Sequence, residues 1–473
     1  MAIKFPREQV LDRITFENPW WETGKVDPFY NDMRRRAYFQ LFYPLVTERK
    51  IKRAVVLMGP RRVGKTVLLF HSIQELLTAG VPADNICYFS IETPLYNGIA
   101  LEELVNLYLT LRKKSTAEAT YIYFDEIQYL KGWELHLKSL VDSYHNVKFV
   151  VSGSAAAALK LKSRESGAGR FTDFLLPPLT FHEFIVLTDE VQLIDEVKMN
   201  VDGHIRATDI KQLNDKFLDY LNFGGYPELS LSPAIQADPG RYIRHDIVDK
   251  VLLRDLPSLY GITDVQELNS LFTYIAYNSG GEMSLEGITQ HAGVAKNTVK
   301  KYLAYLEAAF LIKIIHRIDQ SGKKFKRANF FKVYLTNPSL RSALFSPLTF
   351  DDPQMGNMVE TAIFAQWQHD PNKQLYYARW GSGEVDMVDL DRLQKPDWCV
   401  EIKWSNQFAD NLSKLKSLTS FALKHRLEDV TVTTIDIDRT VEIDGLSYEF
   451  IPASEYCYAV GRNLVENRLE SGK

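Results

Sequence analysis

The sequence is poor in cysteine and contains no long apolar run. Its 473 residues include three cysteines, Cys87, Cys399 and Cys457, which lie far apart and show no zinc-binding spacing. This pattern argues against a disulfide framework and favours a reducing compartment, so we expect a cytoplasmic protein. No stretch reaches the about 18 uncharged apolar residues of a membrane-spanning helix, and the N-terminus lacks the apolar core of a signal peptide. We therefore expect no membrane partner.

The sequence also lacks an excess of either charge. Lys and Arg number 56 against 60 Asp and Glu, and the net charge of −4 argues against a strongly basic nucleic-acid-binding protein. The average hides residues 296–332, where ten Lys or Arg stand against two acids and the local charge is +8. The rest of the chain therefore sums to −12. The length of 473 residues suits about two to four domains of typical size.

Between residues 51 and 155, short apolar segments alternate with helical patterns. Such alternation predicts a parallel sheet flanked by helices. We expect strands at 53–58, 85–91, 120–124 and 148–152, and helices at 66–79, 101–112 and 133–144.

A phosphate-binding loop follows the first of these strands. Residues 59–66 fit the pattern G-x-x-x-x-G-K-[ST] between an apolar strand and a helix, which is the context that such a loop requires. Backbone N–H groups and the helix N-terminus would bind nucleotide phosphates. We expect Lys65 to neutralise the β- and γ-phosphates and Thr66 to ligate Mg²⁺. The predicted nucleotide-binding residues are Gly59, Pro60, Arg61, Arg62, Val63, Gly64, Lys65, Thr66 and Val67.

The strand that ends at Asp125-Glu126 supplies the second half of the predicted nucleotide site. An apolar strand ending in two carboxylates is the Walker B pattern, in which Asp125 would hold Mg²⁺ and Glu126 would polarise the attacking water. The next strand runs into Ser152-Gly153-Ser154, where either serine is a candidate sensor of the γ-phosphate or a helix cap. Arg170 is a candidate arginine finger for a neighbouring subunit, or else an ordinary surface residue.

The basic segment is predicted to form part of a winged helix. Residues 296–309 carry an apolar stripe at helical spacing. Polar residues cluster near the N-terminal end of this helix, where a recognition helix meets DNA: Lys296, Asn297, Lys300 and Lys301. The run 323–327 would form a basic wing that contacts phosphates. The alternative is a winged helix used only for packing.

Near the C-terminus, Asp386 is followed by Glu401-x-Lys403. The period of two places Glu401 and Lys403 on one face of a strand, and a hairpin would bring Asp386 beside Glu401. The pattern resembles the PD-(D/E)XK nuclease site, in which Asp386 and Glu401 would ligate Mg²⁺ and Lys403 would orient the attacking water. Glu360, which shares a helix face with apolar residues, fits a further metal ligand. The alternatives are a surface Asp with a Glu–Lys pair, or a nuclease fold that has lost cleavage.

The chain from about residue 50 to its end resembles prokaryotic AAA+ ATPases that carry a C-terminal domain long labelled as of unknown function. Asn337 stands where this group often has Asp, and residues 1–50 are not covered. The resemblance strengthens the arginine-finger interpretation of Arg170. The matching segments are the P-loop, 125–128, 152–154, 169–170, 178–184, 224–228 and 334–337.

This resemblance implies an α/β fold with a P-loop AAA+ parallel sheet core, a helical lid, a winged helix and a C-terminal restriction-endonuclease-like domain. The predicted domains are an N-terminal arm at 1–50, the AAA+ core at 51–190, the lid at 191–278, the winged helix at 279–345 and the PD-(D/E)XK nuclease-like domain at 346–473.

The function implied is an ATP-dependent DNA-processing ATPase with a Mg²⁺-dependent nuclease-like domain. ATP and Mg²⁺ would be its cofactors, and its partners would be DNA, preferably branched, and further copies of the chain. The alternative is an ATP-gated signalling or assembly switch whose C-terminal domain binds a partner or DNA without cutting it. Trp20 and Trp21 would stack on bases or, as we favour, anchor the N-terminal arm to the core.

Overall fold

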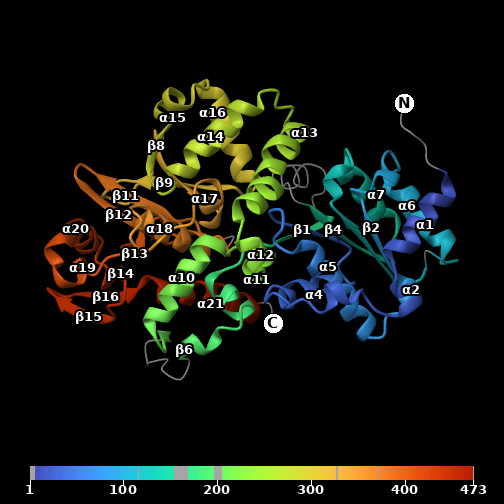
Figure 1. Ribbon diagram of the computed structural model, residues 1–473, viewed down its shortest axis with the longest axis horizontal. Coiled ribbons are helices and arrows are strands. Elements are labelled where there is room, and N and C mark those ends of the chain that lie inside the picture. Colours follow the sequence, from blue (N-terminus) through green and yellow to red (C-terminus); the bar gives the residue numbers. More distant parts are fainter. Residues whose placement is uncertain are drawn as a thin grey trace. The chain divides into compact units, whose positions relative to one another are not determined.

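The computed structural model describes residues 6–115, 117–153, 169–195, 205–325, 329–370 and 372–471. The chain divides into two compact units, one formed by residues 1–177 with 468–473 and the other by residues 178–467 (Figure 1). Among the described helices, none has both the length and the apolar character needed to cross a membrane.

The first unit is built on a parallel sheet. Its five described strands follow the order β2-β3-β4-β1-β5, which confirms the predicted parallel α/β core. The predicted strands and helices of this region match the observed ones to within one residue at each end. All residues of the central strands β1 and β3 are buried, as expected for a sheet covered on both faces. The strands are β1 (Ala54–Met58), β2 (Ile86–Ser90), β3 (Thr120–Asp125), β4 (Val147–Gly153) and β5 (Phe171–Leu175).

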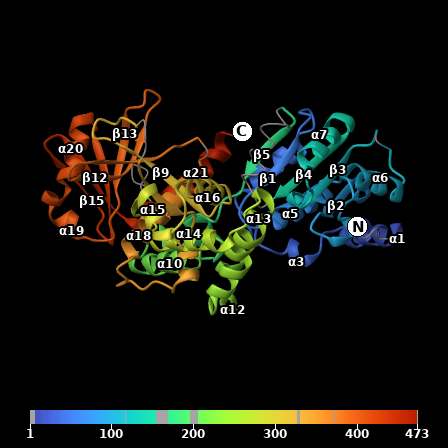
Figure 2. The same ribbon diagram turned by 90° about the horizontal axis from the view of Figure 1, so that it is seen from above.

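Helices cover both faces of this sheet. Figures 1 and 2 show α5 on one face and α6 and α7 on the other. The N-terminal helices join these layers, since α1 contacts β2 and α6 while α3 and α4 contact α5. The helices are α1 (Arg7–Glu17), α2 (Trp20–Thr23), α3 (Pro28–Asn31), α4 (Phe39–Thr47), α5 (Lys65–Thr78), α6 (Leu101–Leu111) and α7 (Trp133–Ser143).

The N-terminal segment is attached to the sheet by its tryptophan pair. The indole N–H groups of Trp20 and Trp21 both donate to the carbonyl oxygen of Ile86, at 3.1 and 2.8 Å. The amide of Asn18 accepts from the N–H of Tyr88 and donates to its carbonyl. Trp20 is fully buried, so it anchors the segment and is not available to stack on a base.

The second unit begins with helices. A helical segment with the wide π geometry, η6 and η7, lies in its middle. The elements before the large sheet are α9 (Phe181–Leu187), β6 (Ile194–Asp195), β7 (Arg206–Ala207), α10 (Ile210–Phe223), α11 (Pro227–Leu231), α12 (Pro233–Gln236), η6 (Gly240–Asp249), η7 (Val251–Asp255), α13 (Leu256–Tyr260) and α14 (Val265–Tyr277).

A large mixed sheet forms the rest of the second unit. Its nine described strands follow the order β15-β16-β14-β13-β12-β11-β9-β10-β8. The strands are β8 (Glu282–Ser284), β9 (Ile312–Ile318), β10 (Phe330–Leu335), β11 (Tyr376–Trp380), β12 (Gly383–Leu390), β13 (Pro396–Glu401), β14 (Asp429–Thr434), β15 (Arg439–Ile443) and β16 (Leu446–Pro452). The accompanying helices are α15 (Leu285–Ala292), α16 (Lys296–Ala308), α17 (Ser339–Leu344), α18 (Met355–Trp367), α19 (Gln407–Asp410), α20 (Lys416–His425) and α21 (Ala453–Ser471).

One pairing in this sheet crosses a predicted domain boundary. Strand β9, from the predicted winged helix, pairs in parallel with β11, from the predicted nuclease-like domain, through the register His316 to Tyr376 and Ile318 to Ala378. The two segments therefore share one sheet, although the sequence analysis separated them at residue 345. The five-part division of the chain stays a prediction, because the structure divides it only into two units.

Candidate functional sites

The P-loop joins β1 to α5, and its lysine points into the loop. Lys65 is only 5% exposed, and its ammonium group donates to the carbonyl oxygens of Gly59 and Pro60 at 3.1 and 2.7 Å. Gly64 has a φ of +94°, a conformation that favours glycine. A Cβ on Gly59 would lie 2.3 Å from the carbonyl oxygen of Leu176, so only glycine fits there.

The predicted Mg²⁺ ligands lie side by side. The hydroxyl of Thr66 donates to Oδ2 of Asp125 at 2.7 Å, and the hydroxyl of Tyr88 donates to the same oxygen at 2.8 Å. Burial, and then the charge of Glu126, raise the pKa of Asp125. Two neighbouring hard oxygen donors, one at the end of β3 and one in the first turn of α5, fit the ligand preference of Mg²⁺.

Glu126 is held beside Asp125 in an unusual backbone conformation. Its φ of +53° is rare for a residue other than glycine. Its N–H donates to the hydroxyl of Ser152 at 3.2 Å, and Ser152 in turn donates to Asp125. The side-chain amide of Gln128 donates to the carboxylate of Glu126. Of the two candidate sensors, Ser152 therefore contacts the carboxylate pair, whereas Ser154 lies outside the described residues.

Two residues that support this site were missed by the sequence analysis. Tyr88 reaches Asp125 from β2, and Arg36 donates to the carbonyl oxygens of Val63 and Pro177 at 3.0 and 2.8 Å. Arg36 is buried and therefore steadies the backbone of the P-loop. Neither residue stands at a fixed distance from a motif, so the sequence pattern carried no signal for it.

Arg170 lies at the edge of the sheet opposite the P-loop. It immediately precedes β5, whose first residue is paired with the first residue of β1, while the P-loop follows the last residue of β1. Its guanidinium pairs with the carboxylate of Asp142 at 3.0 Å, and both side chains are more than 40% exposed. Arg170 therefore does not belong to the nucleotide site of its own chain.

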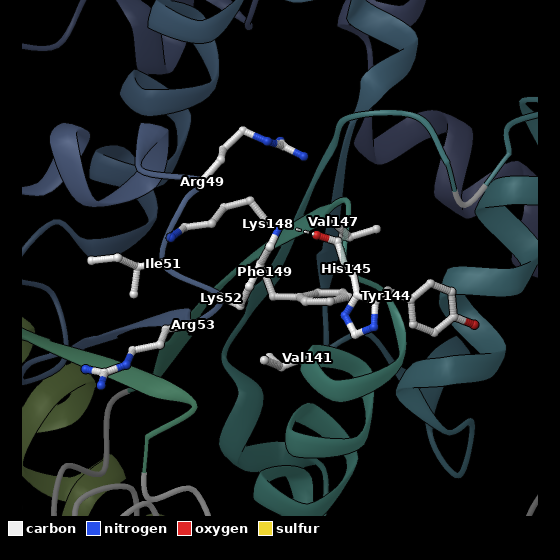
Figure 3. Close-up of a pocket in the computed structure, with 10 residues that line it drawn as sticks. All are labelled: Arg49, Ile51, Lys52, Arg53, Val141, Tyr144, His145, Val147, Lys148 and Phe149. Atoms are coloured by element: carbon white, nitrogen blue, oxygen red, sulfur yellow. Dashed lines mark hydrogen bonds between the residues drawn. The ribbon is translucent and has the colours of Figure 1, made fainter.

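A small pocket opens at this same edge (Figure 3). Its cations are directed at main-chain carbonyls, since Lys52 donates to His145 at 2.6 Å and Lys148 donates to Glu48 at 2.8 Å. Burial lowers the pKa of Lys148 to about 8. The pocket lies at the amino ends of β1 and β4, away from the P-loop. It is lined by Arg49, Ile51, Lys52, Arg53, Val141, Tyr144, His145, Val147, Lys148 and Phe149.

In the second unit, the hairpin of β12 and β13 brings together the predicted nuclease-like residues. Asp386 lies opposite Glu401, because Met387 is paired with Val400 in the antiparallel register. The ammonium of Lys403 contacts Oδ2 of Asp386 at 2.7 Å and Oε1 of Glu401 at 2.9 Å. The N–H of Ile402 also donates to Asp386, at 3.0 Å. The sequence therefore predicted this grouping, although the catalytic roles of its members stay a prediction.

Glu360 joins the same group from α18, but a lysine lies between it and Asp386. Lys332, on β10, contacts Glu360 at 2.9 Å, Glu384 at 2.9 Å and Asp386 at 3.6 Å. The hydroxyl of Tyr334 donates to Glu360 at 2.5 Å. We call the four acids Glu360, Glu384, Asp386 and Glu401 the carboxylate cluster. Lys332 was counted with the basic surface segment in the sequence, but the structure buries it here.

The carboxylate cluster does not fit a metal ion as it stands. Within the described part of the chain, no group of three or more Asp, Glu, His or Cys side chains is arranged to hold one. Burial acts to raise the pKa of Asp386, but the charges of Lys403 and Lys332 lower it. The net result is a lowered pKa. Burial, and then Asp386, raise the pKa of Glu401 to about 7. The negative charges of the predicted metal ligands are thus balanced by lysine side chains. These ligands are Glu360, Asp386 and Glu401.

The predicted recognition helix is α16. Its apolar residues Val299, Leu303 and Leu306 are buried, and it follows α15 after a short turn. Lys296 pairs with Glu286. Residues 326–328 lie outside the described part of the chain. The polar side chains at its N-terminal end are exposed, as predicted: Lys296, Asn297, Lys300 and Lys301.

Comparisons with known proteins agree with the P-loop unit. Residues 51–185 match the family model described as "AAA domain", and residues 214–352 match a "Domain of unknown function (DUF8612)". The first match spans β1 to β5 and supports an AAA+ ATPase core. The chain is 24% identical over 401 residues to an uncharacterized protein of Haemophilus influenzae, covering 84% of this chain and 92% of that one. It is 25% identical over 363 residues to the uncharacterized protein MJ1544 of Methanocaldococcus jannaschii, covering 74% and 76%.

Solved structures show only a loose overall likeness. The ORC1 protein of Aeropyrum pernix, determined in complex with DNA, is 13% identical with a TM-score of 0.30, covering 66% of this chain and 96% of that one. The replication initiator DnaA, bound to AMPPCP and single-stranded DNA, is 14% identical with a TM-score of 0.27, covering 60% and 92%. TM-scores this low carry no argument about function.

Proposed function

We propose that this protein hydrolyses ATP at the P-loop and uses the energy to act on DNA. The observation that carries the proposal is the contact of Thr66 with Asp125 at 2.7 Å beside the ammonium of Lys65. Lys65 would neutralise the phosphates, Thr66 and Asp125 would hold Mg²⁺, and Glu126 would orient and deprotonate the attacking water. The hydroxyl of Ser152, which accepts a hydrogen bond from the N–H of Glu126 at 3.2 Å, holds Glu126 in position for this task.

Two variants of the P-loop unit test the hydrolysis proposal. Lys65→Ala should abolish ATP binding, because the phosphates lose their main counter-charge. Glu126→Gln should keep binding but lower kcat by about 10²- to 10⁴-fold, which is the usual contribution of a general base. Lys25→Ala, at an exposed lysine of the same unit, is the matched control. Nucleotide binding and phosphate release would be measured separately, and hydrolysis at the normal rate by Glu126→Gln would contradict its role.

The DNA part of the proposal is supported by α16. Lys300 and Lys301 are exposed, whereas Val299 and Leu303 of the same helix are buried. The order α14, β8, α15, α16, β9 and β10 is that of a winged helix, in which the helix at the place of α16 would lie against the major groove. Branched DNA is the preferred substrate class, on the resemblance alone.

Stimulation of ATP hydrolysis by DNA separates this function from a signalling or assembly switch. We expect a four-way junction to raise the hydrolysis rate more than a linear duplex of the same length. A chain that hydrolyses ATP but neither binds DNA nor responds to it would instead fit the switch. The chain is further proposed to form homo-oligomers and to act in the cytoplasm.

We propose that the nuclease-like region binds DNA without cleaving it. Lys332 and Lys403 occupy the carboxylate cluster, so no cleavage step through a metal is derived from it. Incubation of branched and linear DNA with Mg²⁺ should therefore give no nicking by the native chain. Nicking that is lost in both Asp386→Ala and Lys403→Ala would establish Mg²⁺-dependent cleavage at this site instead.

A further inference from the structure

The carboxylate cluster is assembled from three elements, one helix and the two strands of a hairpin. Glu360 comes from α18, Glu384 and Asp386 from β12, and Glu401 from the end of β13. Asp386 and Glu360 are only 7% and 8% exposed. Buried carboxylates need a counter-charge, because removing an unpaired charge from water is costly. The cluster therefore requires a cation.

Lys332 supplies that cation from the neighbouring part of the sheet. Its side chain is 5% exposed, and its ammonium reaches Glu360 and Glu384 at 2.9 Å and Asp386 at 3.6 Å. An ammonium group has three protons and no acceptor, so it can serve three carboxylates at once. We propose that the ammonium of Lys332 stands in this nuclease-like site where a divalent metal ion would otherwise bind, so that the native chain takes up no metal there.

Asp386, the central ligand expected for a metal, has both of its oxygens engaged. Oδ1 faces Lys332, while Oδ2 accepts from the ammonium of Lys403 and from the N–H of Ile402. A divalent ion at Asp386 would also lie close to two ammonium groups, which repel it. Glu401 contacts Lys403 through Oε1 at 2.9 Å, and no hydrogen-bond partner of its buried Oε2 is found among the described residues. If Lys332 were removed, Glu401 would therefore be the carboxylate most available to bind a metal ion, and a substitution there is the most direct test for one.

The backbone holds Lys332 in this position. Lys332 is paired with Ile315 of β9 on one side and with Glu282 of β8 on the other. A residue in the interior of a three-stranded ladder cannot withdraw without breaking backbone hydrogen bonds on both sides. The lysine is therefore a fixed part of the sheet rather than a side chain on a loop. It also ties β10 to β12, across the junction of β9 and β11.

The proposal is tested by counting Mn²⁺ ions bound to the full chain without nucleotide. Mn²⁺ serves as the probe because its free form is measured directly by electron paramagnetic resonance. The native chain and Glu401→Gln should bind equal numbers of Mn²⁺ ions, since any ion at the P-loop is common to both. A smaller number for Glu401→Gln would show that the native cluster holds a metal and would overturn the proposal.

Lys332→Met tests the same idea in the opposite direction. Methionine keeps the length of the stem but removes the charge, so the variant should bind one more Mn²⁺ per chain than the native protein. Its melting temperature should rise with Mn²⁺, and Lys332→Met/Glu401→Gln should lose both gains. Lys403→Met is the matched control, which should gain no ion because Lys332 remains. A folded Lys332→Met chain that binds no extra Mn²⁺ would refute the proposal. If Lys332→Met does not fold, with or without Mn²⁺, the comparison of the native chain with Glu401→Gln decides.

Discussion

Burial changes the acidity of individual carboxylates in this protein. Glu455, on α21, is 5% exposed, and burial raises its pKa to about 7 despite the N–H of Ala207, which donates to it at 2.7 Å. Its second oxygen finds no hydrogen-bond partner within the part of the chain that the structure describes. The folded chain therefore holds a proton on Glu455 over a pH range in which the unfolded chain has released it.

This proton makes stability depend on pH. Between pH about 4.5 and about 7 the folded state binds more protons than the unfolded state, so the free energy of unfolding falls as the pH rises through this window. The contribution of Glu455 is at most about 3 kcal/mol. Glu455→Gln should remove it, and urea denaturation at pH 5 and pH 7.5 measures the difference.

The exposed Glu428→Gln is the control for this measurement. It should leave the pH dependence of unfolding as it is in the native chain, because it removes no buried carboxylate. If Glu455→Gln keeps the native pH dependence, the buried carboxylate of Glu455 is not its source.

Single residues also show where sequence patterns stop. Lys65, Thr66 and Asp125 were predicted together, because the P-loop and Walker B motifs fix their places relative to strands. Lys332 was not, because a lysine between apolar residues was counted as part of a basic surface. The sign that was available is its context, Phe331-Lys332-Val333-Tyr334, which reads as a strand with both faces buried.

At the scale of elements, the amphipathic character of α16 leads to a prediction about DNA affinity. Lys300→Ala/Lys301→Ala should weaken duplex binding at low salt. The plot of log affinity against log salt concentration has a negative slope, and each phosphate contact that is lost should make this slope shallower by about 0.9. Fluorescence anisotropy at several salt concentrations measures this slope.

Lys424→Ala is the matched control, since Lys424 is an exposed lysine on α20 of the same unit. It should leave both affinity and slope unchanged. An equal loss in both variants would indicate a diffuse charge effect, and no loss in the double variant would leave α16 without a role in DNA binding.

Helices and strands were predicted best where the pattern of neighbouring residues alone determines them. The four strands between residues 51 and 155 are short runs of apolar residues separated by turns and amphipathic helices, so their limits followed from the sequence. The pairing of β9 with β11 was not predicted, since it joins strands that are more than fifty residues apart and has no local signal. The antiparallel hairpin of β12 and β13 was predicted because its strands are neighbours in sequence.

At the scale of the whole molecule, the location of Arg170 predicts that hydrolysis needs a second copy of the chain. Arg170 lies at the edge of the sheet opposite its own P-loop, so it can meet a γ-phosphate only in another copy. Arg170→Ala and Lys65→Ala should each be inactive alone. When mixed, they should regain activity, because about a quarter of the interfaces combine an intact P-loop with an intact arginine.

The control for this mixing experiment is Lys50→Ala, at an exposed residue that precedes β1. This variant should hydrolyse ATP at the native rate by itself. If Arg170→Ala is fully active, or if the mixture stays inactive although the chains assemble, Arg170 is not an arginine finger.

The continuous sheet of the second unit has a practical consequence for dividing the chain. A break near residue 345 would separate β9 from β11 and leave each with an unpaired row of N–H and C=O groups. Such edges recruit other strands, so both fragments would tend to aggregate, even though the sequence suggests a natural boundary there. A fragment of the second unit that keeps β8 through β16 together avoids these open edges, and the smallest workable piece of this region is therefore the whole sheet.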